Sequence, residues 1–146
     1  METTSPQIHF SFQGIKVEQF AVFEENYKPK NETGIAVGFE FKLNQSIKQI
    51  GVFLSIDFEQ CKKKFLRILV SCHYKIEDET WVNFVHAEDA NIVLPKHFIA
   101  HIAMITVSTT RGVLFAKTEG TFCSQFIVPL INVTEMIAHD AVFEIK

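Results

Sequence analysis

The chain has 146 residues, a formal net charge of −3, 47% hydrophobic residues and 21% charged residues. This length suits one domain with its own core, so we expect a single domain over residues 1–146. The mild negative charge argues against nucleic acid as a partner, because the only basic run is Lys62-Lys63-Lys64.

The N-terminal segment Met1 to Gln7 is polar and lacks the basic start and apolar run of a signal peptide, so we expect a cytoplasmic protein. Three Cys residues without a CxxC pair agree with reduced thiols in that compartment. Apolar and polar residues then alternate from Ile8 to Phe12, and the alternation resumes after Gly14 as Ile15-Lys16-Val17. The shift of one residue predicts a bulged strand.

Three further strands follow. Residues alternate clearly from Ile35 to Leu43, and again from Val52 to Phe58 and from Leu66 to Tyr74, two segments that Cys61 to Lys64 would join as a hairpin. Four sequential strands with short connections predict an antiparallel meander whose one face covers the core. The opposite face also carries apolar residues, which indicates a helix, another subunit or a ligand over it; these residues are Phe53, Phe65 and Leu69.

A long helix is predicted from about Pro95 to about Ala116, because proline suits the first turn of a helix. The apolar stretch Ile92 to Val107 is interrupted by polar residues and is shorter than the ~20 residues that span a bilayer, so we expect no membrane insertion. Small residues on part of the helix would let another helix approach closely. A strand over Ile102 to Ser108 remains an alternative, since β-branched residues are frequent there.

A second, short C-terminal helix is predicted to end near Ala138. Asn132-Val133-Thr134-Glu135 places an N-cap residue three positions before an acid, which is a capping-box arrangement. The expected fold class is therefore α+β, with a four-stranded antiparallel sheet, one long helix and one short C-terminal helix.

Several strings resemble the SecB family of protein-export chaperones, over nearly the whole chain. Phe10 to Ile15, followed by Val22-Phe23-Glu24, is similar to the family's opening strand, F-x-I-Q-R-I and then S-F-E. Ile92-Val93-Leu94-Pro95, with Arg111-Gly112 further on, resembles the I-L-F-P start and S-R-G end of the family's main helix. Phe126 to Ile137 is similar to the string L-N-L-A-P-V-N-F-D-A-L-F.

The resemblance implies an ATP-independent holdase that binds unfolded or precursor polypeptides in an apolar groove, needs no cofactor or metal, and assembles as a homotetramer, a dimer of dimers. The segments that flank the main helix are where the family places its crossover loop and the approach to its last helix. The client-binding residues expected from this are Trp81, Phe84, Phe122 and Phe126. The alternative is that these aromatic residues only fill the core. We expect Phe39 and Phe41 to lie in the core.

Three departures from the family pattern argue against delivery of clients to a SecA-like motor. Members that deliver to SecA are markedly acidic and carry a longer last helix and a docking tail, whereas this chain has a net charge of only −3. Leu66-Arg67-Ile68 stands where the family shows an acidic position. Glu18 and Glu24 remain candidates for docking a basic partner, and a member linked to a toxin–antitoxin pair, with an antitoxin as partner, is the other interpretation.

The rival function is a hot-dog-like enzyme or small-ligand carrier with an enclosed apolar pocket. Its polar catalytic group would come from His97, His101 or Asp89. His97 and His101 are four residues apart, yet no third metal ligand follows at a suitable spacing, so ordinary surface histidines are expected. Cys72 and His73 would point to opposite faces of a strand, which rules out a nucleophile–base pair. A third interpretation is an adaptor subunit that binds one folded partner.

Overall fold

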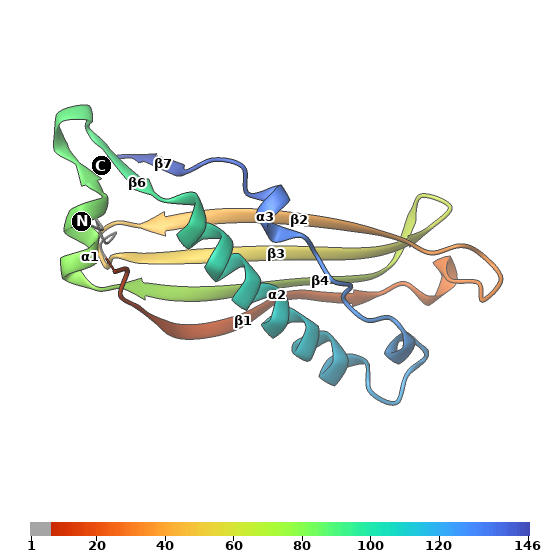
Figure 1. Cartoon of the computed structure of the whole chain (residues 1–146). Helices are drawn as coiled ribbons and strands as arrows, with labels where there is room; N and C mark the ends of the chain where they lie inside the picture. The colour runs from red at the N-terminus through yellow and green to blue at the C-terminus, as the bar shows by residue number, and fades with distance from the viewer. Residues whose placement is uncertain (1–6) are drawn as a thin grey trace, which may run out of the picture.

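The computed structural model describes residues 7–146 and has the predicted α+β architecture, with a long helix lying across one face of a four-stranded antiparallel sheet (Figure 1). The strands of this sheet are β1 (Phe10–Val22), β2 (Gly34–Asn44), β3 (Gln49–Gln60) and β4 (Lys63–Ile76). The helices are α1 (Asp78–Phe84), α2 (Lys96–Thr118) and α3 (Val133–Met136), and the 3-10 turns are η1 (Glu24–Asn26), η2 (Ala87–Asp89) and η3 (Phe122–Gln125). A smaller sheet contains β5 (Val85–His86), β6 (Asn91–Leu94) and β7 (Ala141–Glu144).

The strand order is β1-β4-β3-β2, which corrects the sequential order expected from the sequence. Strands β2, β3 and β4 form the predicted meander, whereas β1 pairs with β4 and not with β2. The connection from Val22 to Gly34 carries η1 and passes from one edge of the sheet to the other. Both β1 and β2 are therefore edge strands of this sheet.

Strand β1 contains the predicted bulge and a second one. The pairing with β4 skips Gln13, next to Gly14, and then skips Glu18. Each extra residue reverses the alternation, so the apolar side chains on both sides of each bulge stay on the face that carries α2. Without the bulges, Ile15 and Val17 would face away from the helix.

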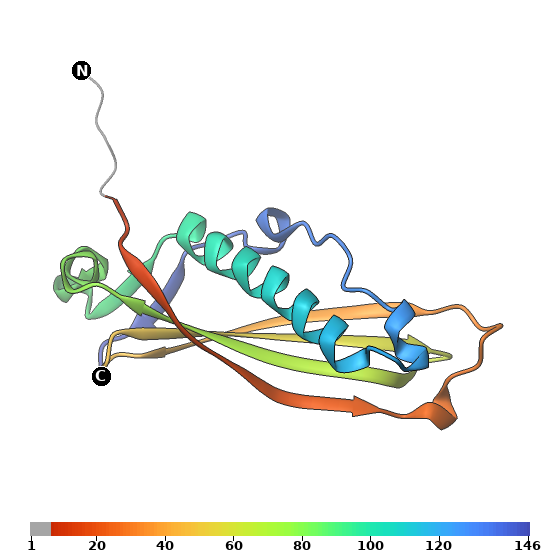
Figure 2. The ribbon, with the colours of Figure 1, turned by 90° about the horizontal axis from the view of Figure 1, so that it is seen from below.

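The core lies between α2 and the two central strands (Figure 2). Ile50, Leu54, Ile68 and Tyr74 have no exposed surface, and the helix contributes Phe98, Ile102 and Leu114 from its buried face. The alternative of a strand over residues 102–108 is wrong, because these residues form the middle of α2. By length and composition α2 is apolar enough to cross a membrane. In this fold, however, half of its most apolar stretch is buried against the rest of the protein.

Buried threonines in α2 are satisfied within the helix. Thr106, Thr110 and Thr118 each donate to the carbonyl oxygen four residues earlier, at 2.7–2.8 Å. The Tyr74 hydroxyl lies 2.8 Å from Thr106 Oγ1, and burial raises the pKa of this tyrosine. These hydroxyls fill the helix–sheet interface without leaving an orphaned polar group.

The short elements near the ends of the sheet differ most from expectation. Helix α1 and strand β7 were not predicted. Helix α3 begins at the predicted cap, where Asn132 Oδ1 accepts the Glu135 N–H at 3.3 Å, and it ends at Met136, before the expected Ala138.

Candidate functional site

Apolar side chains on the helix-bearing face of both edge strands remain partly exposed, because α2 covers mainly β3 and β4. On β2 these side chains face the core residues of β3: Leu43 pairs with Ile50 and Phe39 with Leu54. We call this set the β2 row; its members are Ile35, Val37, Phe39, Phe41 and Leu43. Ile35 is 42% exposed and the other four are half-buried. The expectation that Phe39 and Phe41 are core residues is therefore met only in part.

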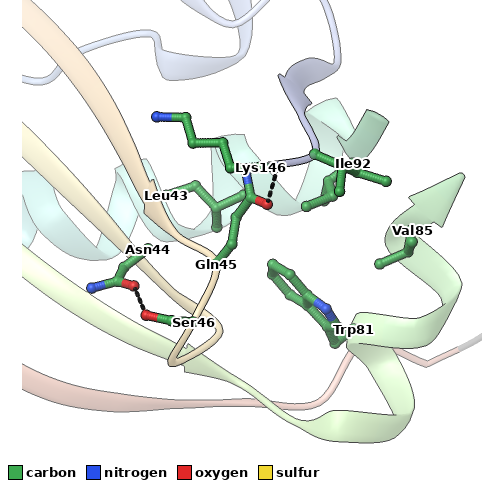
Figure 3. Close-up of a pocket in the computed structure, with 9 residues that line it drawn as sticks. Leu43, Asn44, Gln45, Ser46, Trp81, Val85, Ile92 and Lys146 are labelled. Carbon is green, nitrogen blue, oxygen red and sulfur yellow. Dashed lines mark hydrogen bonds between the residues drawn. The ribbon is translucent and has the colours of Figure 1, made fainter. Parts of the chain in front are cut away.

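One end of the β2 row opens into a cavity of about 670 Å³ (Figure 3). Leu43 and the turn Asn44–Ser46 form one side, Val85 and Ile92 form another, and the Trp81 ring lies between them. Trp81 is 9% exposed, so only one part of the indole meets this cavity. Residues Ile145 and Lys146 close the remaining side.

The other end of the row lies beside a cluster of aromatic rings. Ile35 pairs with Phe58, whose ring centroid is 5.6 Å from that of Phe126. Phe126 also packs at 5.0 Å against Phe65, the unpaired residue of a bulge between β3 and β4. Tyr27 stacks on Phe122 at 4.8 Å and completes the cluster.

The structure brings the four predicted client-binding residues together as two pairs. Trp81 and Phe84 lie on α1 at one end of the sheet, and Phe122 and Phe126 lie in and after η3 near the other end (Figure 1). Phe84 is buried against Phe98, with ring centroids 5.7 Å apart. Trp81 and Phe126 each line a cavity. Phe84 packs in the core and also borders a cavity of about 390 Å³ near the start of α2, whereas Phe122 serves mainly to pack.

A single arginine ties the segment after η3 to the long helix. Arg111 Nε donates to the Val128 carbonyl oxygen at 2.9 Å, and its Nη2 donates to the Pro129 carbonyl oxygen at 2.8 Å. A cavity of about 410 Å³ lies next to this contact, between Phe115 of α2 and Ile127. Arg111 thereby sets the position of the chain that carries Phe126.

On the other side of α2, strand β1 exposes a second apolar strip. The residues that face the helix side are Phe12, Ile15, Val17, Phe20 and Val22, opposite fully buried residues of β4. Ile15 is 50% exposed and Phe12 is 42% exposed. The outward face of α2 exposes Met104 and Phe115, at 51% and 60%, together with the polar residues His101 and Ser108.

The face of the sheet away from α2 is mixed in charge, and two of its acids, Asp57 and Glu18, accept hydrogen bonds within the chain. Asp57 accepts two hydrogen bonds from Arg67, at 2.9 and 2.8 Å. Glu18 sits at the second bulge of β1 and accepts a hydrogen bond from Ser71 at 2.8 Å. Glu24, the other candidate for docking, is exposed in η1 at the end of β1. The structure therefore does not join Glu18 and Glu24 into one acidic patch.

His73 shares that face. Its Nε2 lies 3.0 Å from Ser71 Oγ, and its ring meets the edge of Phe53. Burial, and next the nearby Lys16, lower the pKa of His73, although Glu18 opposes the shift. Cys72 points the other way into the core, where burial raises the pKa of its thiol. The predicted separation of Cys72 and His73 is confirmed.

The three polar residues considered for an enzyme lie at the surface. His97 borders a cavity of about 390 Å³ near the start of α2, His101 packs against the Phe10 ring at 5.8 Å, and Asp89 is exposed in η2. Within residues 7–146, no group of three His, Cys, Asp or Glu side chains is arranged to hold a metal ion.

The β2 row is the part of the site that sequence reasoning missed. Its alternation was recognised, yet alternation identifies only the face that points inward. How far α2 extends over an edge strand depends on the crossing direction of the helix, which leaves no local signal in β2.

No protein-family model and no curated protein matches this sequence. Among solved structures, the chain is similar to the Mycobacterium tuberculosis Rv1957 SecB-like chaperone, determined in complex with a ChAD peptide from the Rv1956 HigA1 antitoxin. The identity is 8%, the TM-score is 0.50, and the match covers 84% of this chain and 91% of that one. A protein of unknown function from Streptococcus agalactiae matches 87% of this chain and 99% of its own, at 13% identity and a TM-score of 0.36. The fold is SecB-like, which confirms the resemblance at the level of the fold.

Proposed function

We propose that this protein is a holdase that binds unfolded polypeptide segments along the β2 row, without nucleotide or metal. The observation that carries the proposal is a row of partly exposed apolar side chains on an open strand edge, with a cavity lined by Trp81 at one end and aromatic rings at the Phe126 end. An extended segment can add to such an edge through main-chain hydrogen bonds, while its alternate side chains meet the row. The SecB-like fold supports a function of this class.

The expected affinity per segment is modest. Burying an apolar side chain contributes about 1.5–3 kcal/mol, so each partly exposed member of the row adds up to about 1 kcal/mol and the five together about 2–4 kcal/mol. Ordering an unfolded segment offsets part of this gain. Weak contacts that carry little sequence preference suit a chaperone that must hold many segments and release them.

We further propose a dimer of dimers. Between Lys96 and Lys117 of α2 the only Lys, Arg, Asp or Glu is Arg111, and its guanidinium is turned onto backbone carbonyl groups. An outward helix face without free charge suits contact with the same helix of another subunit. The β1 strip, on the opposite edge from the β2 row, suits an interface in which β1 pairs with β1 of a second copy.

We base the proposed location and partners on the cysteines and on the charges of the outer face. All three cysteines are free, in agreement with the cytoplasm. On the outer face Asp57 is paired with Arg67, and Glu40 lies 4.0 Å from Lys42. Acids and bases are mixed there, so this face offers a basic motor no uniformly acidic surface. We therefore favour an antitoxin-like or other cytoplasmic client over delivery to a SecA-like motor.

The test is suppression of aggregation. Purified protein is mixed with a chemically unfolded model protein, and light scattering is followed with the wild type, with Phe41→Ser in the β2 row, and with Glu40→Ser as the matched control on the other face of the same strand. Thermal unfolding shows whether each variant remains folded. Near-stoichiometric suppression that weakens in Phe41→Ser and persists in Glu40→Ser supports the proposal.

A wild-type protein that leaves aggregation unchanged would contradict a holdase function. Equal suppression by both variants would place the client elsewhere than the β2 row. Tight binding to one folded partner, with indifference to unfolded proteins, would indicate an adaptor.

A further inference from the structure

We propose that β7, with the two residues that follow it, is a displaceable internal occupant beside the Trp81 end of the β2 row, and that an extended apolar client segment binds there by taking the place of β7. This inference rests on the proposed holdase function and concerns how the same site is regulated. In this proposal β7 and the client segment compete for the same position beside β6.

The first support is the position of β7. The strand covers four residues, Ala141–Glu144, and pairs only with β6, in the smaller sheet. The residues that follow it, Ile145 and Lys146, form one side of the 670 Å³ cavity that Trp81 and Leu43 line (Figure 3). A segment in the position of β7 therefore stands beside the Trp81 end of the β2 row.

The second support is the way in which the fold holds this segment. Gln45, in the turn between β2 and β3, uses both ends of its side-chain amide. Its Nε2 donates to the Glu144 carbonyl oxygen at 2.7 Å, and its Oε1 accepts the Lys146 N–H at 3.1 Å. The Ile145 N–H donates to the Ala90 carbonyl oxygen at 3.1 Å. All these contacts recognise main chain, so they suit any extended segment and do not depend on the side chains of β7.

The third support is that β7 is an incomplete occupant. Of its side chains, Val142 is 61% exposed, while Ala141 and Phe143 are only half-buried. Asn91, which pairs with Glu144 in the register of β6 and β7, has a buried Oδ1 atom with no hydrogen-bond partner among residues 7–146. A buried acceptor without a donor costs free energy, so β7 leaves the polar groups of β6 incompletely satisfied.

Displacement predicts a population effect on affinity. When the binding-competent state is a minor one, the apparent dissociation constant rises by the inverse of its population. Weakening the hold of β7 should therefore tighten client binding, and locking β7 in place should weaken it. A strand that is only structural would produce neither effect.

The experiment uses a reversible lock on the full chain. Val93 and Val142 are cross-strand partners, so Val93→Cys with Val142→Cys places two thiols within reach of a disulfide, in a Cys61→Ser background that removes the exposed native thiol. Binding of a dye-labelled, permanently unfolded model protein is measured by anisotropy in the oxidised and reduced states. Emission from Trp81, the single tryptophan, reports on the cavity.

We expect the oxidised protein to bind about tenfold more weakly, or weaker still, than the same protein after reduction. The disulfide holds β7 on β6, so the state in which β7 has left, which is the state that binds the client, is no longer populated. Phe143→Ala, which loosens β7, should tighten binding about fivefold, equivalent to roughly 1 kcal/mol. Val142→Ala, an exposed change on the same strand, should leave affinity unchanged.

Equal affinity in the oxidised and reduced states overturns the inference while leaving the holdase intact. If the reduced protein and its Cys61→Ser parent both fail to bind the unfolded probe, the proposed function fails instead. Amide hydrogen exchange gives a second readout, since client binding should speed exchange in residues 141–146 and a fixed strand would keep its protection.

Discussion

The β1 strip predicts that two substitutions on one edge strand will separate the subunits. We choose Ile15→Thr together with Val17→Thr, because threonine keeps the β-branched shape that suits a strand while it removes apolar surface. Ile15 is 50% exposed and Val17 is 40% exposed in the isolated chain. That exposed surface is what a second copy would bury.

The magnitude follows from these exposures. Full burial of such a side chain contributes about 1.5–3 kcal/mol, so the exposed half of each contributes roughly 1 kcal/mol on association. A two-fold interface contains each position twice, which gives roughly 4 kcal/mol for the double variant. The dissociation constant of the dimer should then rise about a thousandfold.

Light scattering coupled to size-exclusion chromatography over a concentration series measures this change directly. The matched control is Lys16→Thr, which lies between the two positions on the opposite face of β1. We expect the wild type and the control to keep the mass of the assembly at concentrations where the double variant is dissociated. Unchanged mass in the double variant, or a monomeric wild type, would refute an interface at the β1 strip.

Three further predictions concern stability. Tyr74→Phe should lower the free energy of unfolding by about 1 kcal/mol in urea titrations, because Thr106 keeps its own bond to a backbone carbonyl group and no partner is orphaned; a loss above about 3 kcal/mol would contradict this. Arg111→Met should cost about 1–2 kcal/mol and speed hydrogen exchange in residues 126–131, as two charge-assisted hydrogen bonds are lost. The pKa of His73 is lowered in the folded state, so the contribution of this residue to the free energy of unfolding is fully present above pH 6.5, the pKa of the unfolded state. This contribution is lost as the pH falls below 6.5 and through the lower pKa of the folded state. His73→Gln should therefore flatten the decline in stability between about pH 7.5 and pH 5, and an unchanged slope would refute the assignment.

The sheet and long helix could be predicted because their patterns are local and strong. In β3 and β4 every second residue is buried, so alternation alone identified the inward face. Pro95 marked the start of α2, and the Asn132 cap marked α3. Even the first bulge of β1 was readable at Gly14, and the second left a similar signal in the spacing of Val17 and Phe20.

Long-range pairing and short elements could not be predicted. The choice of β4 as the partner of β1 depends on contacts between residues far apart in sequence, and no local pattern encodes it. Helix α1 contains Trp81, Val82 and Phe84, which favour strands, and the fold overrides that preference. Strand β7 has only four residues, too few for periodicity to identify.

The candidate site was predicted only in part, because it too depends on contacts between residues far apart in the sequence. The resemblance to the SecB family pointed to aromatic residues in the segments on both sides of α2, and two of them, Trp81 and Phe126, line cavities at the two ends of the β2 row. Phe122 mainly packs, and Phe84 packs against Phe98 while it borders the cavity near His97, because burial is decided by neighbours that the sequence does not name. The β2 row between the two ends emerges only when the path of α2 over the sheet is known.

The most direct test of the central claim is site-specific photo-crosslinking along β2. A photoreactive phenylalanine analogue replaces Phe41, in the β2 row, or Lys42, the next residue on the opposite face. Each protein is irradiated with a dye-labelled unfolded model protein. The proposal predicts a crosslinked client at position 41 and little at position 42. Crosslinking at position 42 with none at position 41 would contradict a client groove on the helix side of the sheet.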